Sequence, residues 1–218
     1  MDVLKKVSDA APALKIFPLP PVVLFPGTGV PLHIFEPRYR QLISDALATD
    51  RVMALGGLAP GWEEAYTDRP ALLPIACAGV IGEHEALPDG RFMIMLEGVT
   101  RVRVRAELPS RKLYREVAVE ILEDAPFKGD EEEALRQAVL ELASLLPEEV
   151  SPPLLHHAAL QSGGLLADVV AGAVVAEPQR RQALLAELEV GARLRAVHAE
   201  ISELIAKLAA MRPALYPN

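Results

Sequence analysis

The sequence predicts an α+β protein with a β-rich N-terminal part and a helical C-terminal part, and three observations lead to this prediction. Prolines and glycines interrupt short apolar stretches in residues 14–35. Apolar and polar residues then alternate in "TRVRVRAEL" and "REVAVEIL", which is the period-two pattern of a half-buried strand. After residue 130 the apolar residues instead recur every three or four positions, as they do in amphipathic helices.

The first 125 residues contain the predicted strands. Turn residues separate the short apolar stretches "LKIFPL", "VVLF", "VPLHIF" and "RVMALGGL", each of which predicts a strand. The prolines between them belong at bends and edges, because sheet interiors exclude proline. "PIACAGVIGEHEAL" and "RFMIMLEGVTRVRVRAEL" flank a Pro-Asp-Gly turn and predict a hairpin. "YREVAVEIL" predicts a third strand after it in the chain.

One helix is predicted among these strands. Pro37 suits the first position of a helix, because proline lacks the N–H that the first turn leaves unpaired. The apolar residues that follow have helical spacing: Tyr39, Leu42, Ile43, Ala46 and Leu47. The helix is expected to end near Thr49.

A linker, "EDAPFKGDEEEA", marks the expected boundary between a β-rich part, residues 1–125, and a helical part, residues 126–218. Asp130 is placed to cap a helix whose first turn contains three glutamates, and these acids suit the positive end of the helix dipole. We expect this helix to stop at Pro147.

Three further helices complete the predicted C-terminal part. The first two are expected at 154–161 and 165–176, before glycines and before Pro178. A single long helix is predicted from Pro178 to about residue 210. Two i, i+4 ion pairs are expected on its exposed face: Glu189–Arg193 and Glu203–Lys207.

Composition argues against several classes of protein. The formal net charge is -8, with no basic tail, which is unsuited to binding a phosphate backbone. No uninterrupted stretch of about 20 apolar residues predicts a membrane span, and the N-terminus does not resemble a secretory signal. The one cysteine, Cys77, has apolar neighbours and predicts a buried, inert thiol. These features predict a cytoplasmic protein.

The opening segment "FPLPPVVLFPGTGVPLHIFEPRYRQLISDAL" closely resembles the start of the Lon protease N-terminal, or substrate-binding, domain, especially its stand-alone bacterial versions. "GVIGEHEALPDGRFMIMLEGVTRVRV" is similar to the central hairpin of that family, and "LLADVVAG" with "EPQRRQALLAELEVGARLRAV" to its helical tail. The resemblance implies a PUA-like β pseudo-barrel, followed by an α-helical bundle that ends in a long helix. In full-length Lon, such a module precedes an ATPase and a protease and helps to engage unfolded polypeptides.

Motifs for catalysis or cofactor binding do not emerge from the sequence. No lysine follows a glycine, so there is no phosphate-binding loop, and no serine lies in G-x-S-x-G or S-x-x-K. The five histidines lack zinc-ligand spacing, and adjacent His156 and His157 point to different helical faces. We therefore predict no enzyme activity, no metal and no cofactor; an unrecognised hydrolase is a less favoured alternative.

A basic cluster is the basis for a second alternative, an RNA-binding PUA-like protein. It comprises Arg101, Arg103, Arg105, Arg111, Lys112 and Arg115. Tyr114 is the one aromatic residue among them, whereas single-strand binders usually combine charge with several stacking aromatics. The favoured interpretation is a polar outer face of a strand, so nucleic acid is not the predicted partner.

Two segments contain the candidate polypeptide-binding residues. In "EPRYR", Arg38 and Arg40 either pair with Glu36 or nearby acids, which is the favoured interpretation, or border a surface groove. In the long loop "GLAPGWEEAYTDRPALL", Trp62 and Tyr66 either anchor an apolar partner or fold back onto the sheet. The predicted function is a non-catalytic module that binds unfolded or partly folded polypeptides, with a protease or chaperone as a further partner.

Overall fold

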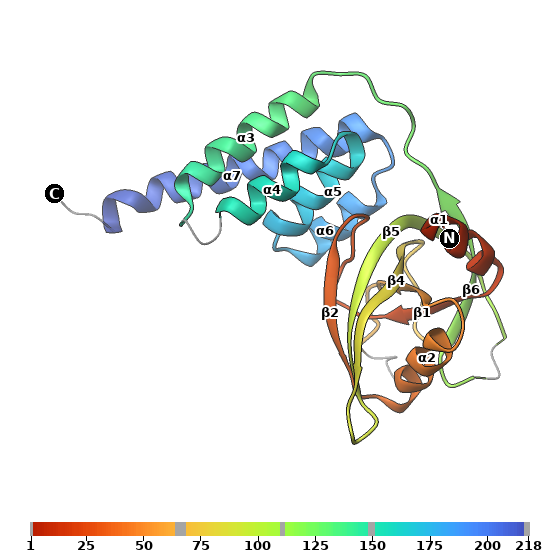
Figure 1. The fold of residues 1–218 in the computed structure, drawn as a ribbon. Coiled ribbons are helices and arrows are strands. Elements are labelled where there is room, and N and C mark those ends of the chain that lie inside the picture. The colour runs from red at the N-terminus through yellow and green to blue at the C-terminus, as the bar shows by residue number, and fades with distance from the viewer. Residues whose placement is uncertain (1, 64–68, 110–111, 148–150, 216–218) are drawn as a thin grey trace. The chain divides into compact units, whose positions relative to one another are not determined.

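A six-stranded sheet forms the N-terminal part of the computed structural model, which describes residues 2–63, 69–109, 112–147 and 151–215. The chain divides into two units, Met1–Glu123 and Asp124–Asn218. The first contains these strands: β1 (Leu14–Pro18), β2 (Gly29–Ile34), β3 (Val52–Gly56), β4 (Ile75–Ala86), β5 (Phe92–Glu107) and β6 (Arg115–Leu122). Their order is β2-β5-β4-β3-β1-β6, and β5 also pairs with β6, which closes a ring of strand pairings (Figure 1).

The predicted central hairpin is confirmed. β4 and β5 pair antiparallel from Ile75↔Arg103 to Ala86↔Phe92. The turn between them is closed by the Leu87 N–H, which donates to the Arg91 carbonyl at 2.8 Å. The predicted third strand is also found as β6, and it pairs antiparallel with β5. Local sequence is sufficient here because turn residues and period-two alternation together specify which residues face each other.

The predicted strand at "VVLF" is wrong, because residues 22–25 join no strand ladder, although Val23, Leu24 and Phe25 are buried. This segment crosses β5 at Gly98 instead. Gly98 donates to the Thr28 carbonyl at 2.8 Å and accepts from the Gly27 N–H at 2.9 Å. A Cβ on Gly98 would overlap the carbonyl oxygen of Phe25 and lie 2.9 Å from its carbonyl carbon. The proline-rich segment therefore lies against β5 where a glycine allows close backbone approach.

Two helices belong to this unit, although only one was predicted. The predicted helix is α2 (Pro37–Leu47), whose apolar stripe buries Tyr39, Leu42, Ile43 and Ala46. The additional helix is α1 (Val3–Ala10), which is followed by the 3₁₀ turn η1 (Ala11–Ala13). α1 buries a single residue, Val7. Val3, Leu4, Val7 and Ala10 do have helical spacing, but this pattern covers only about two turns and was not used.

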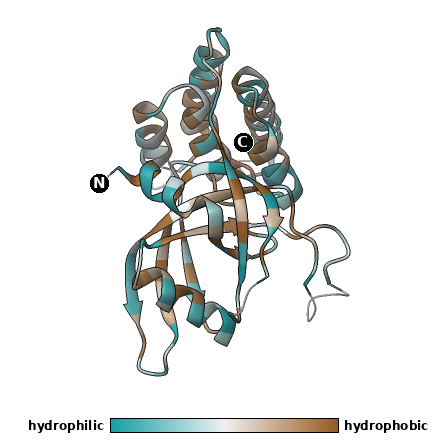
Figure 2. Ribbon diagram, turned by 90° about the vertical axis from the view of Figure 1, so that its right-hand side faces the viewer, coloured by the Kyte–Doolittle hydropathy of each residue, from teal (hydrophilic) through white to brown (hydrophobic). Residues whose placement is uncertain are grey.

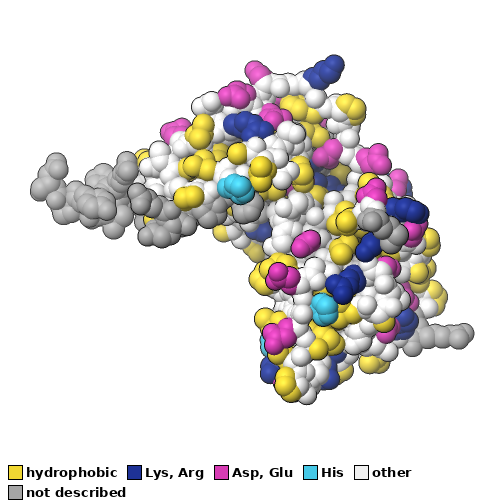
Figure 3. Space-filling view, in the orientation of Figure 1, with side chains coloured by type: hydrophobic (Ala, Val, Ile, Leu, Met, Phe, Trp, Pro, Cys, Tyr) yellow, Lys and Arg dark blue, Asp and Glu magenta, His cyan; other side chains and the backbone are white. Residues whose placement is uncertain are grey.

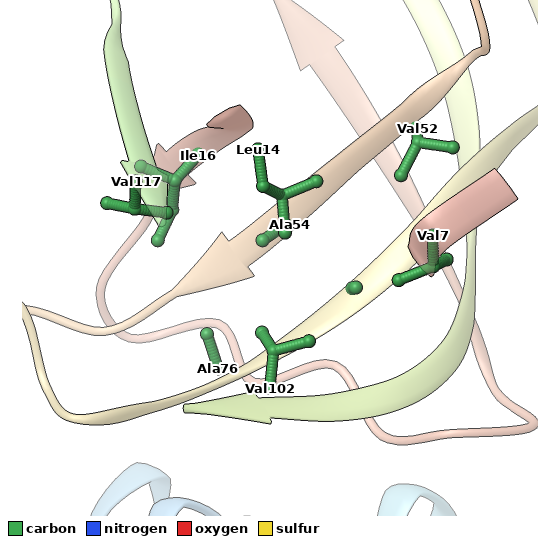
Figure 4. Packing of buried hydrophobic residues seen from close by; sticks show 9 residues of the cluster. Val7, Leu14, Ile16, Val52, Ala54, Ala76, Val102 and Val117 are labelled. Carbon is green, nitrogen blue, oxygen red and sulfur yellow. The ribbon is translucent and has the colours of Figure 1, made fainter. Parts of the chain in front are cut away.

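The core of the first unit consists mostly of small aliphatic side chains. Its buried members are Val7, Leu14, Ile16, Val52, Ala54, Ala76, Ala78, Val102 and Val117. They come from α1 and from β1, β3, β4, β5 and β6, and most are shown in Figure 4. Segments distant in sequence therefore share one apolar interior, and this burial is the main source of their stability.

The second unit is helical. Its elements are α3 (Glu131–Leu145), α4 (Ser151–Leu160), α5 (Gly163–Val174), α6 (Pro178–Ala186) and α7 (Val190–Leu215). Hydrophobic and hydrophilic residues alternate along these helices in Figure 2, which is the pattern expected of helices that bury one side. Asp130 occupies the predicted N-cap position of α3, but its side chain makes no capping hydrogen bond. Its φ of -95° and ψ of -1° are near-helical, whereas capping favours extended backbone.

The single long helix predicted from Pro178 is wrong, because the chain breaks between α6 and α7. Glu189 occupies the N-cap position of α7, and its carboxylate accepts hydrogen bonds from the backbone N–H groups of Gly191, at 2.8 Å, and Ala192. The break contains no proline or glycine that would have signalled it. A glutamate as cap is unusual, and this explains the error.

The predicted Glu189–Arg193 pair is also wrong, because Arg193 is fully buried. Its guanidinium donates to Asp124 and, at 2.8 Å, to the Glu187 carbonyl. Nε lies 3.1 Å from a carboxylate oxygen of Asp168, within ion-pair distance but not aligned for a hydrogen bond. The Glu203–Lys207 pair, at 2.8 Å, is confirmed.

Candidate functional site

The candidate site is the corner where β2 leads into α2. We call it the β2–α2 corner and define it as His33, Phe35, Glu36, Arg38 and Arg40, with Met93 of β5, which stands opposite His33. Leu32 and Ile34 face the interior, so the alternation of β2 turns His33 and Phe35 outward. Pro37 then starts α2 and brings the two arginines of "EPRYR" onto its first turns. Side chains from a strand end and a helix start thus come together on one surface.

The structure gives each residue of "EPRYR" a distinct environment. Tyr39 is buried against Phe17, with ring centroids 4.1 Å apart. Arg38 pairs with Glu36 at 2.8 Å and lies over the Tyr39 ring, 4.6 Å from its centroid. The predicted inward Tyr39 and the predicted pairing of Arg38 with Glu36 are therefore both found.

Arg40 extends toward the turn of the β4–β5 hairpin. A Cβ on Gly90 would overlap its guanidinium, and Gly90 has a φ of +80°, which favours glycine. The turn glycine therefore both shapes the hairpin and leaves space for Arg40. This contact links the helix that starts at the corner to the hairpin that contains Met93.

Apolar side chains are exposed beside these arginines, and the sequence reasoning missed them. Phe35 is 60% exposed and Met93 is 41% exposed. Met93 stands opposite His33 in the β2–β5 register, and the His33 and Phe35 rings are 5.9 Å apart. The period-two pattern of "VPLHIF" could have revealed the outward Phe35. In Figure 3 small hydrophobic areas lie among charged side chains of both signs over the strands.

The aromatic candidate Trp62 lies elsewhere. Trp62 is half-buried in the loop after β3, and an isolated bridge between Leu58 and Leu72 ties this loop together. Strands β5 and β4 separate β2 from β3 in the sheet, so Trp62 and the β2–α2 corner belong to different parts of it. Tyr66 lies outside the described residues.

The basic cluster is largely neutralised by acids. Arg105 pairs with Glu120, and Arg115 donates to Glu107 at 2.9 Å. Arg101, predicted on a polar outer face, is only 3% exposed. Both faces of the sheet are covered at this point, because Val102 lies in the core and Cys77, which stands opposite Arg101, is buried as predicted. Arg111 lies outside the described residues.

Tyr114, the aromatic residue of that cluster, is only 1% exposed and so presents no face for stacking. Its hydroxyl donates to Asp45 of α2 at 2.8 Å and accepts from the Lys112 ammonium at 2.7 Å. Burial raises the pKa of Tyr114 to about 12. The hydrogen bonds from Lys112 and Tyr114 lower the pKa of Asp45. The hydrogen bonds that Lys112 makes with Tyr114 and with Asp45 raise the pKa of Lys112.

This Asp45–Lys112–Tyr114 cluster predicts acid sensitivity. Folding lowers the Asp45 pKa, so its contribution to stability is present above the unfolded pKa of about 4 and is lost as the pH falls through the lower folded value. We expect the free energy of unfolding to fall between about pH 5 and pH 3, and Asp45→Asn to reduce this dependence. Denaturant titrations of both proteins across this range test the prediction; identical pH slopes would contradict it.

A cavity of ≈ 240 Å³ lies in the helical unit, among residues of α5, α6 and α7. Its charged side chains neutralise one another. Arg180 contacts Glu177 at 2.9 Å and both Glu200 and Glu203 at 3.0 Å. Hydrogen bonds from Lys207 and Arg180 lower the pKa of Glu203 to about 2. Because these charges are already paired, we assign no ligand to this cavity.

Within the described residues, no group of three histidine, cysteine or acidic side chains is placed to hold a metal ion. The same described ranges contain no helix both long enough and apolar enough to cross a membrane.

Comparison with known proteins decides the family. Residues 13–203 match the family model of the ATP-dependent protease La (LON) substrate-binding domain. The chain belongs to this Lon substrate-binding domain family. The Lon protease of Roseiflexus castenholzii is 30% identical over 197 residues, covering 87% of this chain and 24% of the relative. That of Dictyoglomus thermophilum is 26% identical over 198 residues, covering 89% and 25%. The chain thus spans about a quarter of the length of these curated Lon relatives.

Solved structures of Lon N-terminal domains share the α+β fold. The N-terminal domain of Mycobacterium avium complex Lon protease aligns with a TM-score of 0.68 at 18% identity, covering 87% of this chain and 98% of that chain. The Lon N-terminal domain protein from Xanthomonas campestris aligns with a TM-score of 0.59 at 23% identity, covering 89% and 97%. At these identities the likeness concerns the fold alone.

Proposed function

We propose that this chain is a polypeptide-binding module that performs no chemical step itself and presents the β2–α2 corner to partly unfolded proteins. The observation that carries the proposal is membership in a family whose model is that of a substrate-binding domain. An exposed phenylalanine and methionine beside arginines supply a surface for such a role. A protease or a chaperone would be the natural recipient of the bound polypeptide.

The chemistry of the corner suits weak, sequence-tolerant binding. Phe35 offers an apolar ring, and Met93 offers a flexible thioether that adapts to side chains of different shape. Arg38 is paired with Glu36, so its positive charge is already compensated. Its main contribution to binding is then the planar, amphipathic surface of its side chain. Binding should therefore depend on apolar contact and change little with salt.

RNA binding is less well supported, because acids pair with the arginines of the basic cluster and Tyr114 is buried. We further propose that residues 1–125 form the PUA-like pseudo-barrel and residues 126–218 the helical bundle implied by the family resemblance. The ring of strand pairings supports the first assignment. The packing of α3 and α5 on α7 supports the second.

The proposal is tested by fluorescence anisotropy of a labelled, permanently unfolded polypeptide titrated with the full chain. The double variant Phe35→Ser/Met93→Ser should weaken binding about tenfold, because each change removes an apolar contact made only in the complex. Leu113→Ser is the matched control, since Leu113 is also exposed in the first unit but lies outside the corner. It should bind like the unchanged protein.

Three outcomes would contradict part or all of this proposal. No saturable polypeptide binding by the unchanged protein would reject the function. Binding that survives the double variant but is lost in Trp62→Ala would move the site to the loop after β3. Salt-sensitive binding of a labelled RNA oligomer, without polypeptide binding, would favour the basic cluster.

A further inference from the structure

Helix α1 inserts one side chain into the interior of the first unit. Val7 is fully buried and belongs to the same apolar cluster as Val52, Ala76 and Val102. Figure 4 shows Val7 pointing from α1 toward the strands that carry these residues. α1 contacts β3, β4 and β5. The structure therefore contains an apolar socket that Val7 fills, and small side chains, including Ala54 and Ala78, contribute to the surrounding cluster.

Val7, with the half-buried Ala10 beside it, makes the apolar contact of α1 with the core. Among the described residues, the hydrogen bonds and the ion pair found for residues 2–10 stay within residues 2–11. Asp2 accepts from the Leu4 N–H at 3.1 Å, and Lys5 pairs with Asp9 at 3.3 Å. Val3 and Leu4 are exposed. An eight-residue helix held by one fully buried side chain and one half-buried alanine is the kind of element that opens locally while the rest of a domain stays folded.

The strands that form the socket are held independently of α1. β3 pairs with β1 and β4, and β4 pairs with β5, through ladders in which α1 takes no part. The family match begins at residue 13, so it includes these strands and excludes α1. When α1 leaves, the socket walls are therefore expected to remain in place, with an apolar opening where Val7 was.

We propose that α1 is a removable plug, and that the socket it fills is a binding site for an aliphatic side chain of a partly unfolded polypeptide. This inference rests on the proposed polypeptide-binding function and adds a site and a means of regulating it. Val7 itself indicates the occupant, because the socket already accepts a branched aliphatic side chain presented by a short segment with polar residues around it. The plug and the polypeptide compete for the same apolar volume.

The test compares three full-length proteins in the polypeptide anisotropy assay. Val7→Asp should expel α1, since a carboxylate is costly to bury, and should tighten binding at least fivefold. Val3→Asp is the matched control, because it places the same charge on an exposed position of the same helix; its affinity should not change. Val7→Gly, which removes the side chain without adding charge, should also tighten binding and serves if Val7→Asp does not fold.

A second measurement separates the plug from the proposed function. A labelled peptide of residues 2–13 should bind the Val7→Asp protein saturably and the unchanged protein at least tenfold more weakly; the same peptide with Val7→Asp should not bind. If the peptide binds this way but no unfolded polypeptide does, the plug stands and the proposed function is wrong. The opposite result is that polypeptides bind the unchanged protein and both Val7 variants equally, while the peptide binds none of them. This result would reject the plug proposal and leave the proposed polypeptide-binding function supported.

Discussion

Replacing Arg193 with methionine is expected to lower the free energy of unfolding of the helical unit by about 3–5 kcal/mol, because it leaves the buried Asp168 carboxylate without its cation. Arg193 also donates to Asp124, the first residue of this unit, and to the Glu187 carbonyl. This one side chain of α7 therefore contacts α5 through Asp168, the segment before α7 through Glu187, and the start of the unit through Asp124. Denaturant unfolding followed by helical circular dichroism measures the loss.

Arg195→Met is the matched control for this experiment. Arg195 lies two positions further along α7, is 59% exposed and pairs with Glu131 and Glu189 at the surface. Its replacement should cost less than about 1 kcal/mol, because exposed ion pairs contribute little. Adding Asp168→Asn to Arg193→Met should recover part of the stability by removing the unpaired charge. Equal losses for Arg193→Met and Arg195→Met would show that the buried network does not stabilise the unit.

Replacing Gly98 with alanine is the second large expected effect, a loss of about 3 kcal/mol in the free energy of unfolding of the first unit. The added methyl group would overlap the Phe25 carbonyl, which is backbone and has little freedom to move. The two hydrogen bonds that join Gly98 to Gly27 and Thr28 would be strained as well. Thermal or denaturant unfolding followed by Trp62 fluorescence would report the change.

Gly82→Ala tests whether this effect comes from backbone overlap or from any loss of glycine in a strand. A Cβ on Gly82 would approach within 2.6 Å of a carboxylate oxygen of Glu97, the far end of an exposed side chain that is able to turn away. We therefore expect a change within about 0.5 kcal/mol. A Gly98→Ala protein as stable as Gly82→Ala would mean that residues 22–25 do not need their close approach to β5.

Several elements could be predicted from sequence because local chemistry specifies them. Turn residues and alternation predicted the β4–β5 hairpin, and a proline followed by helically spaced apolar residues predicted α2. The local environment of Arg38 and Tyr39 was predicted for the same reason, because Glu36 lies two residues away and the helical stripe turns Tyr39 inward. The exposure of Phe35 was also available from the alternation of β2, although it was not used.

Contacts between distant segments were not predictable in this way. "VVLF" has the composition of a strand, but its backbone meets Gly98, more than seventy residues later, and not a strand partner. α1 has apolar residues at helical spacing, but the core that receives Val7 is built by strands far along the chain. The break before α7 depends on Glu189 acting as the helix cap. Glutamate is also common inside uninterrupted helices, so the residue type does not signal a break.

The sequence by itself determined the α+β class, the order of most elements and the family resemblance, because these depend on periodicity, turn residues and motifs that are contiguous in the chain. Only the tertiary structure decided that Arg193 is buried between acids, that Arg101 is buried, and that Met93 stands opposite His33, the neighbour of Phe35. The physical reason is that burial and charge pairing depend on which distant residues become neighbours. That is a property of the packed chain, and no local pattern records it.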